Sequence, residues 1–107
     1  VPAGVEVYEI NGPFFFGAAE TFRSTMRQVA RKPRALVIRM RNVPAMDATG
    51  MHVLKEMLQQ VRRDGTQVIL SEVQEQPLRA LTKSGLLEVI GEGHVVPTID
   101  EALHLAT

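Results

Sequence analysis

The spacing of apolar residues changes several times along the chain and separates strand-like from helix-like segments. Residues 5–10 alternate apolar and polar side chains with a period of two, which is typical of a strand with one face on a core. Residues 35–38 and 67–71 are short apolar runs rich in β-branched side chains, a composition that favours buried strands. Val95 and Val96 predict one further short strand.

Helical spacing follows these strand-like segments. Apolar residues recur every three or four positions, with polar residues between them, and this pattern predicts amphipathic helices. The helical segments are 18–30, 54–61, 77–84 and 99–106. The last of them opens with Thr98 and Glu101 in the arrangement of a capping box.

The segment after the first strand predicts a hairpin. Asn11 and Gly12 accept positive φ, and Phe14–Phe16 predicts a short second strand that Gly17 ends. We interpret the three phenylalanines as core and sheet-face residues, because no basic residues interleave with them as in a base-stacking surface. A segment this short leaves open whether they pack inside or form a contact patch.

From residue 35 onward, strands and helices alternate. This order favours an α/β domain in which helices pack on a parallel sheet through right-handed crossovers. At 107 residues the chain is one domain, long enough to bury a core of its own. The chain begins with valine, and we expect it to be a part of a longer protein.

Residues 43–50 join the strongest strand signal to the strongest helix signal. Asp47 is placed to cap the helix by accepting a hydrogen bond from the backbone N–H of Thr49 or Gly50. Thr49 lies in the first helical turn, where the helix dipole would favour a phosphate on its hydroxyl. Two interpretations stay open: Asp47 caps, Thr49 fills space and Gly50 allows close packing, or the turn is a phosphorylation switch.

Two cations precede this turn. Arg39 and Arg41 alternate with Met40 at the end of the strand, and we expect both to project from one side toward Asp47. They are able to pair with an anion at the turn or with neighbouring carboxylates, and the sequence leaves both alternatives open.

Composition excludes several kinds of chemistry. The chain has no cysteine, which excludes disulfides, zinc thiolate sites and cysteine nucleophiles. Its twelve basic and twelve acidic residues argue against a nucleic-acid partner. No apolar run approaches the roughly 18 residues of a membrane helix. The three histidines are far apart, and no phosphate loop, dinucleotide fingerprint or nucleophile elbow is present, so we predict no metal, no cofactor and no enzyme activity.

The order of elements, the Asp47-Ala48-Thr49-Gly50 turn and the downstream Gln76-Pro77-Leu78 together resemble the STAS domain. This domain is shared by bacterial anti-sigma-factor antagonists and the cytoplasmic tails of SulP anion transporters. Residues 5–20, with their Gly-Pro-Phe-Phe-Phe stretch, and residues 43–47 look like the transporter branch. The resemblance spans nearly the whole chain.

The resemblance implies a four- to five-stranded mixed, largely parallel sheet with about four helices packed mainly on one side. It implies that residues 1–107 are a single STAS domain, a fragment of a longer membrane transporter. The implied role is a non-catalytic regulatory and protein-interaction domain of a SulP-type transporter for sulfate or a related anion. Its partners would be the membrane domain in the same polypeptide and a soluble protein, at the cytoplasmic face of the inner (plasma) membrane, with the fragment itself soluble.

The resemblance also points to site residues. In the antagonist branch the hydroxyl residue before the motif glycine is phosphorylated by a partner kinase, and that position is Thr49; the chain departs by carrying Ala48 and Thr49 where antagonists often have serine. The alternative function is therefore a free-standing anti-sigma-factor antagonist switched at Thr49, with an anti-sigma factor and a kinase as partners. A third is a small-ligand or nucleotide binder. The predicted regulatory loop is Asp47, Ala48, Thr49 and Gly50, and the predicted partner contacts are Met46, Met51, His52 and Lys55.

Overall fold

Strands and helices follow one another largely in the predicted order. The computed structural model describes residues 2–28 and 32–107, which contain four strands, five α-helices and one short 3-10 helix. In chain order they are β1 (Val5–Asn11), α1 (Phe16–Arg27), β2 (Ala35–Asn42), α2 (Ala48–Arg63), β3 (Gln67–Ser71), α3 (Glu75–Ser84), α4 (Leu86–Ile90), the 3-10 helix Glu92–His94, β4 (Val95–Val96) and α5 (Ile99–Ala106).

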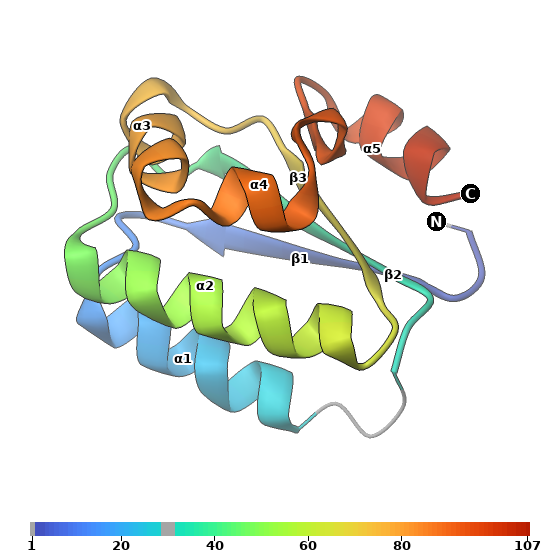
Figure 1. The fold of residues 1–107 in the computed structure, drawn as a ribbon, viewed down its shortest axis with the longest axis horizontal. Coiled ribbons are helices and arrows are strands. Elements are labelled where there is room, and N and C mark those ends of the chain that lie inside the picture. The colour runs from blue at the N-terminus through green and yellow to red at the C-terminus, as the bar shows by residue number, and fades with distance from the viewer. Residues whose placement is uncertain (1, 29–31) are drawn as a thin grey trace.

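The strands form one sheet in the order β1-β2-β3-β4, and all neighbouring strands are parallel (Figure 1). Leu36 in β2 pairs with Glu6 of β1 on one side and with Val68 of β3 on the other. Each parallel neighbour requires a crossover, and helices supply these connections. The largely parallel sheet that was predicted is therefore wholly parallel within the described residues.

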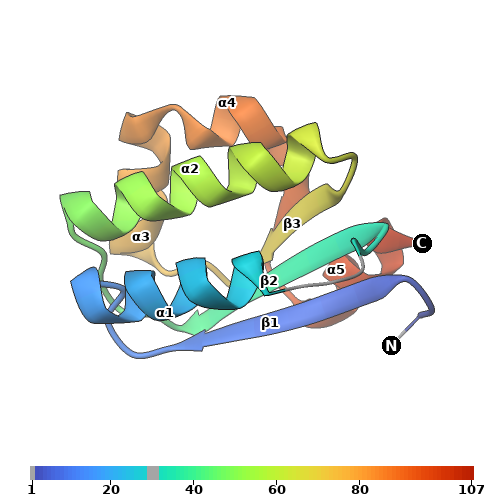
Figure 2. The ribbon, with the colours of Figure 1, turned by 90° about the horizontal axis from the view of Figure 1, so that it is seen from below.

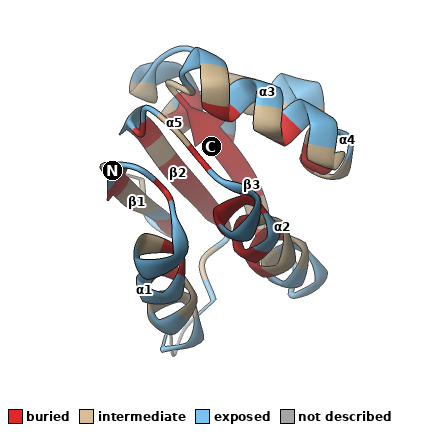
Figure 3. Ribbon diagram, turned by 90° about the vertical axis from the view of Figure 1, so that its left-hand side faces the viewer, coloured by how far each residue is buried: buried red, intermediate tan, exposed pale blue. Residues whose placement is uncertain are grey.

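The two faces of the sheet are covered unequally. Helices α1 to α4 lie on one face and α5 lies on the other (Figure 2). Alternation along β2 shows this directly, because Leu36 and Ile38 join the larger core under α1 to α4, whereas Ala35 and Val37 join a smaller core with α5. Figure 3 shows the resulting buried band along β2 and β3. The predicted packing of helices mainly on one side is confirmed.

The predicted hairpin and second strand are wrong. Gly12 has the expected positive φ of 88°, but the chain does not return alongside β1. Phe14 instead forms an isolated parallel bridge with Met46, and α1 already begins at Phe16, so Gly17 lies inside a helix. Turn residues predict that the chain changes direction, but they do not predict which segment the next residues pair with. Here Phe14 pairs with Met46, and its ring is buried in the core.

The three phenylalanines have different environments. Phe14 is fully buried, with its ring edge-to-face against Phe22 at 5.9 Å between centroids. Phe15 and Phe16 are 45% and 63% exposed, so the interpretation as core residues is correct for Phe14 alone.

The C-terminus of α1 differs from its prediction, whereas the N-terminus of α5 agrees with it. The helix predicted to reach Ala30 ends at Arg27, and residues 29–31 lie outside the described residues. At α5, the Thr98 side chain accepts a hydrogen bond from the Glu101 backbone N–H at 3.1 Å, as the predicted cap requires.

Candidate functional site

The turn before α2 has the predicted cap. Asp47 Oδ1 accepts a hydrogen bond from the Gly50 backbone N–H at 2.7 Å. Asp47, Ala48 and Thr49 are exposed, whereas Gly50 is buried. The turn therefore presents one carboxylate and one hydroxyl to solvent beside the N-terminus of a sixteen-residue helix.

Gly50 is required by close packing. A Cβ atom added at this position would collide with the Phe14 carbonyl oxygen and would lie 3.0 Å from the Phe14 carbonyl carbon. The main chain of Phe14 is itself held in place, because its N–H donates to the Ala45 carbonyl at 2.9 Å. The predicted role of Gly50 in close packing is confirmed.

Gln76 holds the other side of the same turn. Its Oε1 accepts from the Met46 N–H at 2.8 Å, and its Nε2 donates to the Met46 carbonyl at 3.1 Å. One side-chain amide thus satisfies both main-chain groups of Met46, as a neighbouring strand would. The motif Gln76-Pro77-Leu78 was part of the resemblance, but no local spacing indicates a contact that spans 30 residues.

A groove of about 580 Å³ lies between this turn, α2 and α3, and we refer to it as the α2–α3 groove. It brings together six of the eight predicted site residues, while Thr49 and Gly50 do not line it. The six are Met46, Asp47, Ala48, Met51, His52 and Lys55. Sequence reasoning missed the opposite wall, which is formed by Gln76, Arg79, Ala80, Lys83 and Ser84.

Lys55 connects the two walls of the groove. Its Nζ atom donates to the Ser84 carbonyl oxygen, 2.7 Å away at the end of α3. A cation at the C-terminus of a helix is favourable because the carbonyl groups there have no partner within the helix. Lys55 therefore keeps the far end of α3 against α2, while Gln76 fixes its near end to the turn.

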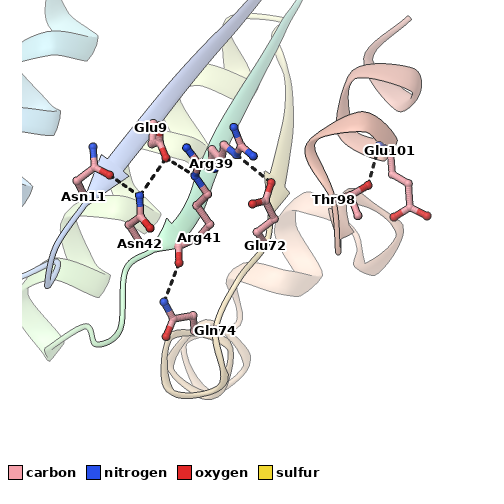
Figure 4. A network of polar contacts seen from close by, with 9 residues as sticks. All are labelled: Glu9, Asn11, Arg39, Arg41, Asn42, Glu72, Gln74, Thr98 and Glu101. Carbon is pink, nitrogen blue, oxygen red and sulfur yellow. Dashed lines mark hydrogen bonds and ion pairs between the residues drawn. The ribbon is translucent and has the colours of Figure 1, made fainter.

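The two arginines before the turn pair with neighbouring carboxylates of the chain. Arg39 Nε contacts Glu72 Oε1 at 2.9 Å, and Arg41 Nε contacts Glu9 Oε2 at 2.7 Å (Figure 4). The hydrogen bond from Arg41 lowers the pKa of the Glu9 carboxyl, and the same bond raises the pKa of Arg41. Glu72, the partner of Arg39, has a φ of 60°, which places its backbone in the left-handed region.

Within residues 2–28 and 32–107, no three histidine, aspartate or glutamate side chains are arranged to hold a metal ion. In those same ranges there is no helix with the length and apolarity that a membrane crossing requires.

In this chain a helix capped by Asp47, with a hydroxyl residue in its first turn, directly follows an internal strand of a parallel sheet. The model of the STAS domain family matches residues 1–102, and the chain belongs to this family.

Three relatives at 33% identity or more are sulfate transporter proteins or a SulP transporter domain. A sulfate transporter family protein from Wolinella succinogenes is 44% identical, with a TM-score of 0.92 over 99% of this chain and 87% of that one. The STAS domain of a SulP transporter from Vibrio cholerae is 38% identical, with a TM-score of 0.86 over 99% of this chain and 83% of that one. The putative sulfate transporter YvdB of Bacillus subtilis is 33% identical over 91% of this chain, which spans 18% of its length.

More distant structures share the fold alone. The murine anion transporter Slc26a9 is 23% identical with a TM-score of 0.86, and the chain covers 18% of it. A putative anti-sigma factor antagonist from Thermotoga maritima is 16% identical with a TM-score of 0.81. Both branches of the family therefore have the architecture described above.

Proposed function

We propose that this domain is a non-catalytic regulatory and protein-interaction domain of a SulP-type transporter for sulfate or a related anion. The observation that carries the proposal is 44% and 38% identity, each over 99% of this chain, to domains from a sulfate transporter family protein and a SulP transporter. Its first partner is the membrane domain of the same polypeptide, at the cytoplasmic face of the inner (plasma) membrane. The 18% share of YvdB that the chain spans is consistent with such a larger polypeptide.

The turn and the α2–α3 groove are the contact region in this proposal. Their geometry supports it, because the main chain of the turn is held by Phe14 and Gln76 while three consecutive side chains of the turn remain exposed. A rigid backbone that presents exposed side chains loses little conformational entropy when a partner binds.

Anion uptake by the full-length transporter tests the regulatory role. We would compare labelled sulfate uptake by the wild type, a form lacking this domain, Ala48→Arg in the exposed turn, and the matched control Ala3→Arg before β1. At equal abundance in the membrane, the truncation and Ala48→Arg should change the initial rate at least about twofold, a barrier change of roughly 0.4 kcal/mol. The control should match the wild type. Unchanged uptake by the truncated form would refute the proposal.

An anti-sigma-factor antagonist switched at Thr49 is the second candidate. It is favoured by the exposure of Thr49 in the first helical turn of α2, where no residue after the Asp47 cap is acidic. A phosphate there would complement the positive end of the helix dipole. Mass spectrometry after incubation with the cognate kinase should then find phosphate on Thr49. An unmodified Thr49 in a protein that still binds its anti-sigma factor would count against this function.

Binding of a small ligand or nucleotide is the third candidate. A second cavity, of about 280 Å³, lies between β1 and the C-terminal ends of α1 and α2. At its edge Lys32 pairs with Asp64 at 2.8 Å, and Thr66 Oγ1 donates to the Pro33 carbonyl at 2.7 Å. A ligand bound there would raise the melting temperature, and the rise would continue with the logarithm of ligand concentration above the dissociation constant. A flat response across nucleotides and small acids would remove this candidate.

A further inference from the structure

The α2–α3 groove carries an excess of positive charge. Its walls contain Lys55 on α2 and Arg79 and Lys83 on α3, against the single carboxylate of Asp47. Three cations and one anion leave a formal charge of +2, with His52 neutral, on a chain whose basic and acidic residues balance. The groove is therefore more positive than the surface as a whole.

Contacts within the protein leave most of this charge uncompensated. Lys55 donates to a carbonyl oxygen, which carries no formal charge. Arg79 pairs with Glu75 at 2.8 Å, but the two side chains are 60% and 89% exposed, and solvent screens such a pair strongly. Lys83 has no ion pair with any described residue.

Apolar residues form part of the groove lining, and we refer to them as its apolar base. They are Met46 and Met51, with 4% and 7% of their surface exposed, and the half-buried Ala80 of α3. Methionine side chains adapt to the shape of an apolar partner. A trough between two helices, with an apolar base and cationic walls, has the form that accepts an amphipathic helix.

We infer that the α2–α3 groove binds an acidic amphipathic helix of a protein partner. The carboxylates of that helix pair with Arg79, Lys83 and Lys55, and its apolar side chains lie over Met51 and Ala80. This inference rests on the proposed interaction role and adds the chemical class of the partner. Clustered charge of one sign steers an oppositely charged partner toward the groove, so association is fast and sensitive to salt.

A designed peptide tests the inference. The probe is a fluorescein-labelled helical peptide of about 15 residues with glutamates on one face and leucines on the other. Fluorescence anisotropy would measure its affinity for the chain at about 50 and 200 mM salt. The double variant Arg79→Glu with Lys83→Glu should weaken binding at least about tenfold, and higher salt should weaken binding to the wild type.

The matched control reverses two other exposed cations. Arg62 and Arg63 lie at the opposite end of α2, and the double variant Arg62→Glu with Arg63→Glu makes the same change in net charge. It should alter affinity less than about twofold. Thermal melts of both variants would confirm folding, and a peptide with serine in place of leucine should bind more weakly if the apolar base contributes.

Two results would overturn the inference. Equal losses in the two double variants would mean that net charge, rather than the groove, attracts the peptide. Binding to phosphatidylglycerol vesicles through Arg79 and Lys83, with no binding of the peptide, would assign the groove to a lipid surface instead. Neither result bears on the uptake experiment. Unchanged uptake by the transporter that lacks this domain would instead overturn the regulatory proposal itself.

Discussion

Replacing Gly50 by alanine tests how closely the turn and the Phe14 segment are held together. The new Cβ would meet the Phe14 carbonyl oxygen and would lie 3.0 Å from its carbonyl carbon and 3.1 Å from Cδ2 of its ring. Carbon atoms in contact prefer about 3.5–4.0 Å. The contact with the oxygen is the shortest, so helix α2 and the Phe14 main chain would have to separate by more than about 1 Å.

The expected loss of stability combines opposing effects. Forcing a methyl group into a packed site costs typically about 1–3 kcal/mol, and here the obstacle is main chain rather than a flexible side chain. Separation also weakens the 2.9 Å hydrogen bond from Phe14 to Ala45, a further loss of about 1 kcal/mol. The higher helix propensity of alanine returns up to about 1 kcal/mol. The net loss is about 1–4 kcal/mol, which lowers the melting temperature by on the order of 5–30 °C.

A second glycine in a helix supplies the control. Gly17 in α1 has no atom within 4 Å of an added Cβ, so Gly17→Ala should keep or raise stability by up to about 1 kcal/mol. Urea unfolding followed by circular dichroism would compare both variants with the wild type. A Gly50→Ala protein as stable as the Gly17→Ala protein would refute the argument from close approach.

Three further changes follow from contacts described above. Gln76→Leu leaves the buried N–H and carbonyl of Met46 without partners and should cost about 2–4 kcal/mol in urea unfolding; a loss below about 0.5 kcal/mol would show that water replaces the amide. Thr98→Ala removes the cap of α5 and should cost about 1 kcal/mol, whereas Thr98→Asp, which can cap in the same way, should retain stability. The lowered pKa of the Glu9 carboxyl contributes stability that is present above its pKa in the unfolded chain and is lost as pH falls through its lower pKa in the folded protein. Glu9→Gln should flatten that part of the pH profile, and an unchanged acid profile would contradict the assignment.

Local rules predicted the elements whose causes are local. The apolar run 35–38 predicts a buried strand, and all four of its residues are buried because helices cover both faces of β2. The Asp47 cap depends on an acceptor three residues before its donor, and the structure contains that bond. The motif Asp47-Ala48-Thr49-Gly50 is contiguous as well, and the structure places it at the start of α2, as the sequence predicted.

Features made by distant residues could not be predicted. Gln76 reaches a turn 30 residues earlier in the chain, and only the packing of α3 brings the two together. Arg79 and Lys83 have the spacing of any exposed helix face, so their place in the groove has no local signal. The hairpin prediction failed for the same reason, because Phe14 pairs with the distant Met46 rather than with β1.

The contact between Gln76 and the turn has a consequence for divergence within the family. The Gln76 side chain forms hydrogen bonds only with main-chain atoms of Met46. These bonds therefore do not depend on which side chains follow Met46. Asp47 contributes a cap that serine, threonine or asparagine can also supply, while Ala48 and Thr49 point to solvent. A lineage can therefore replace the exposed side chains of this turn one by one, while the backbone that carries them stays unchanged.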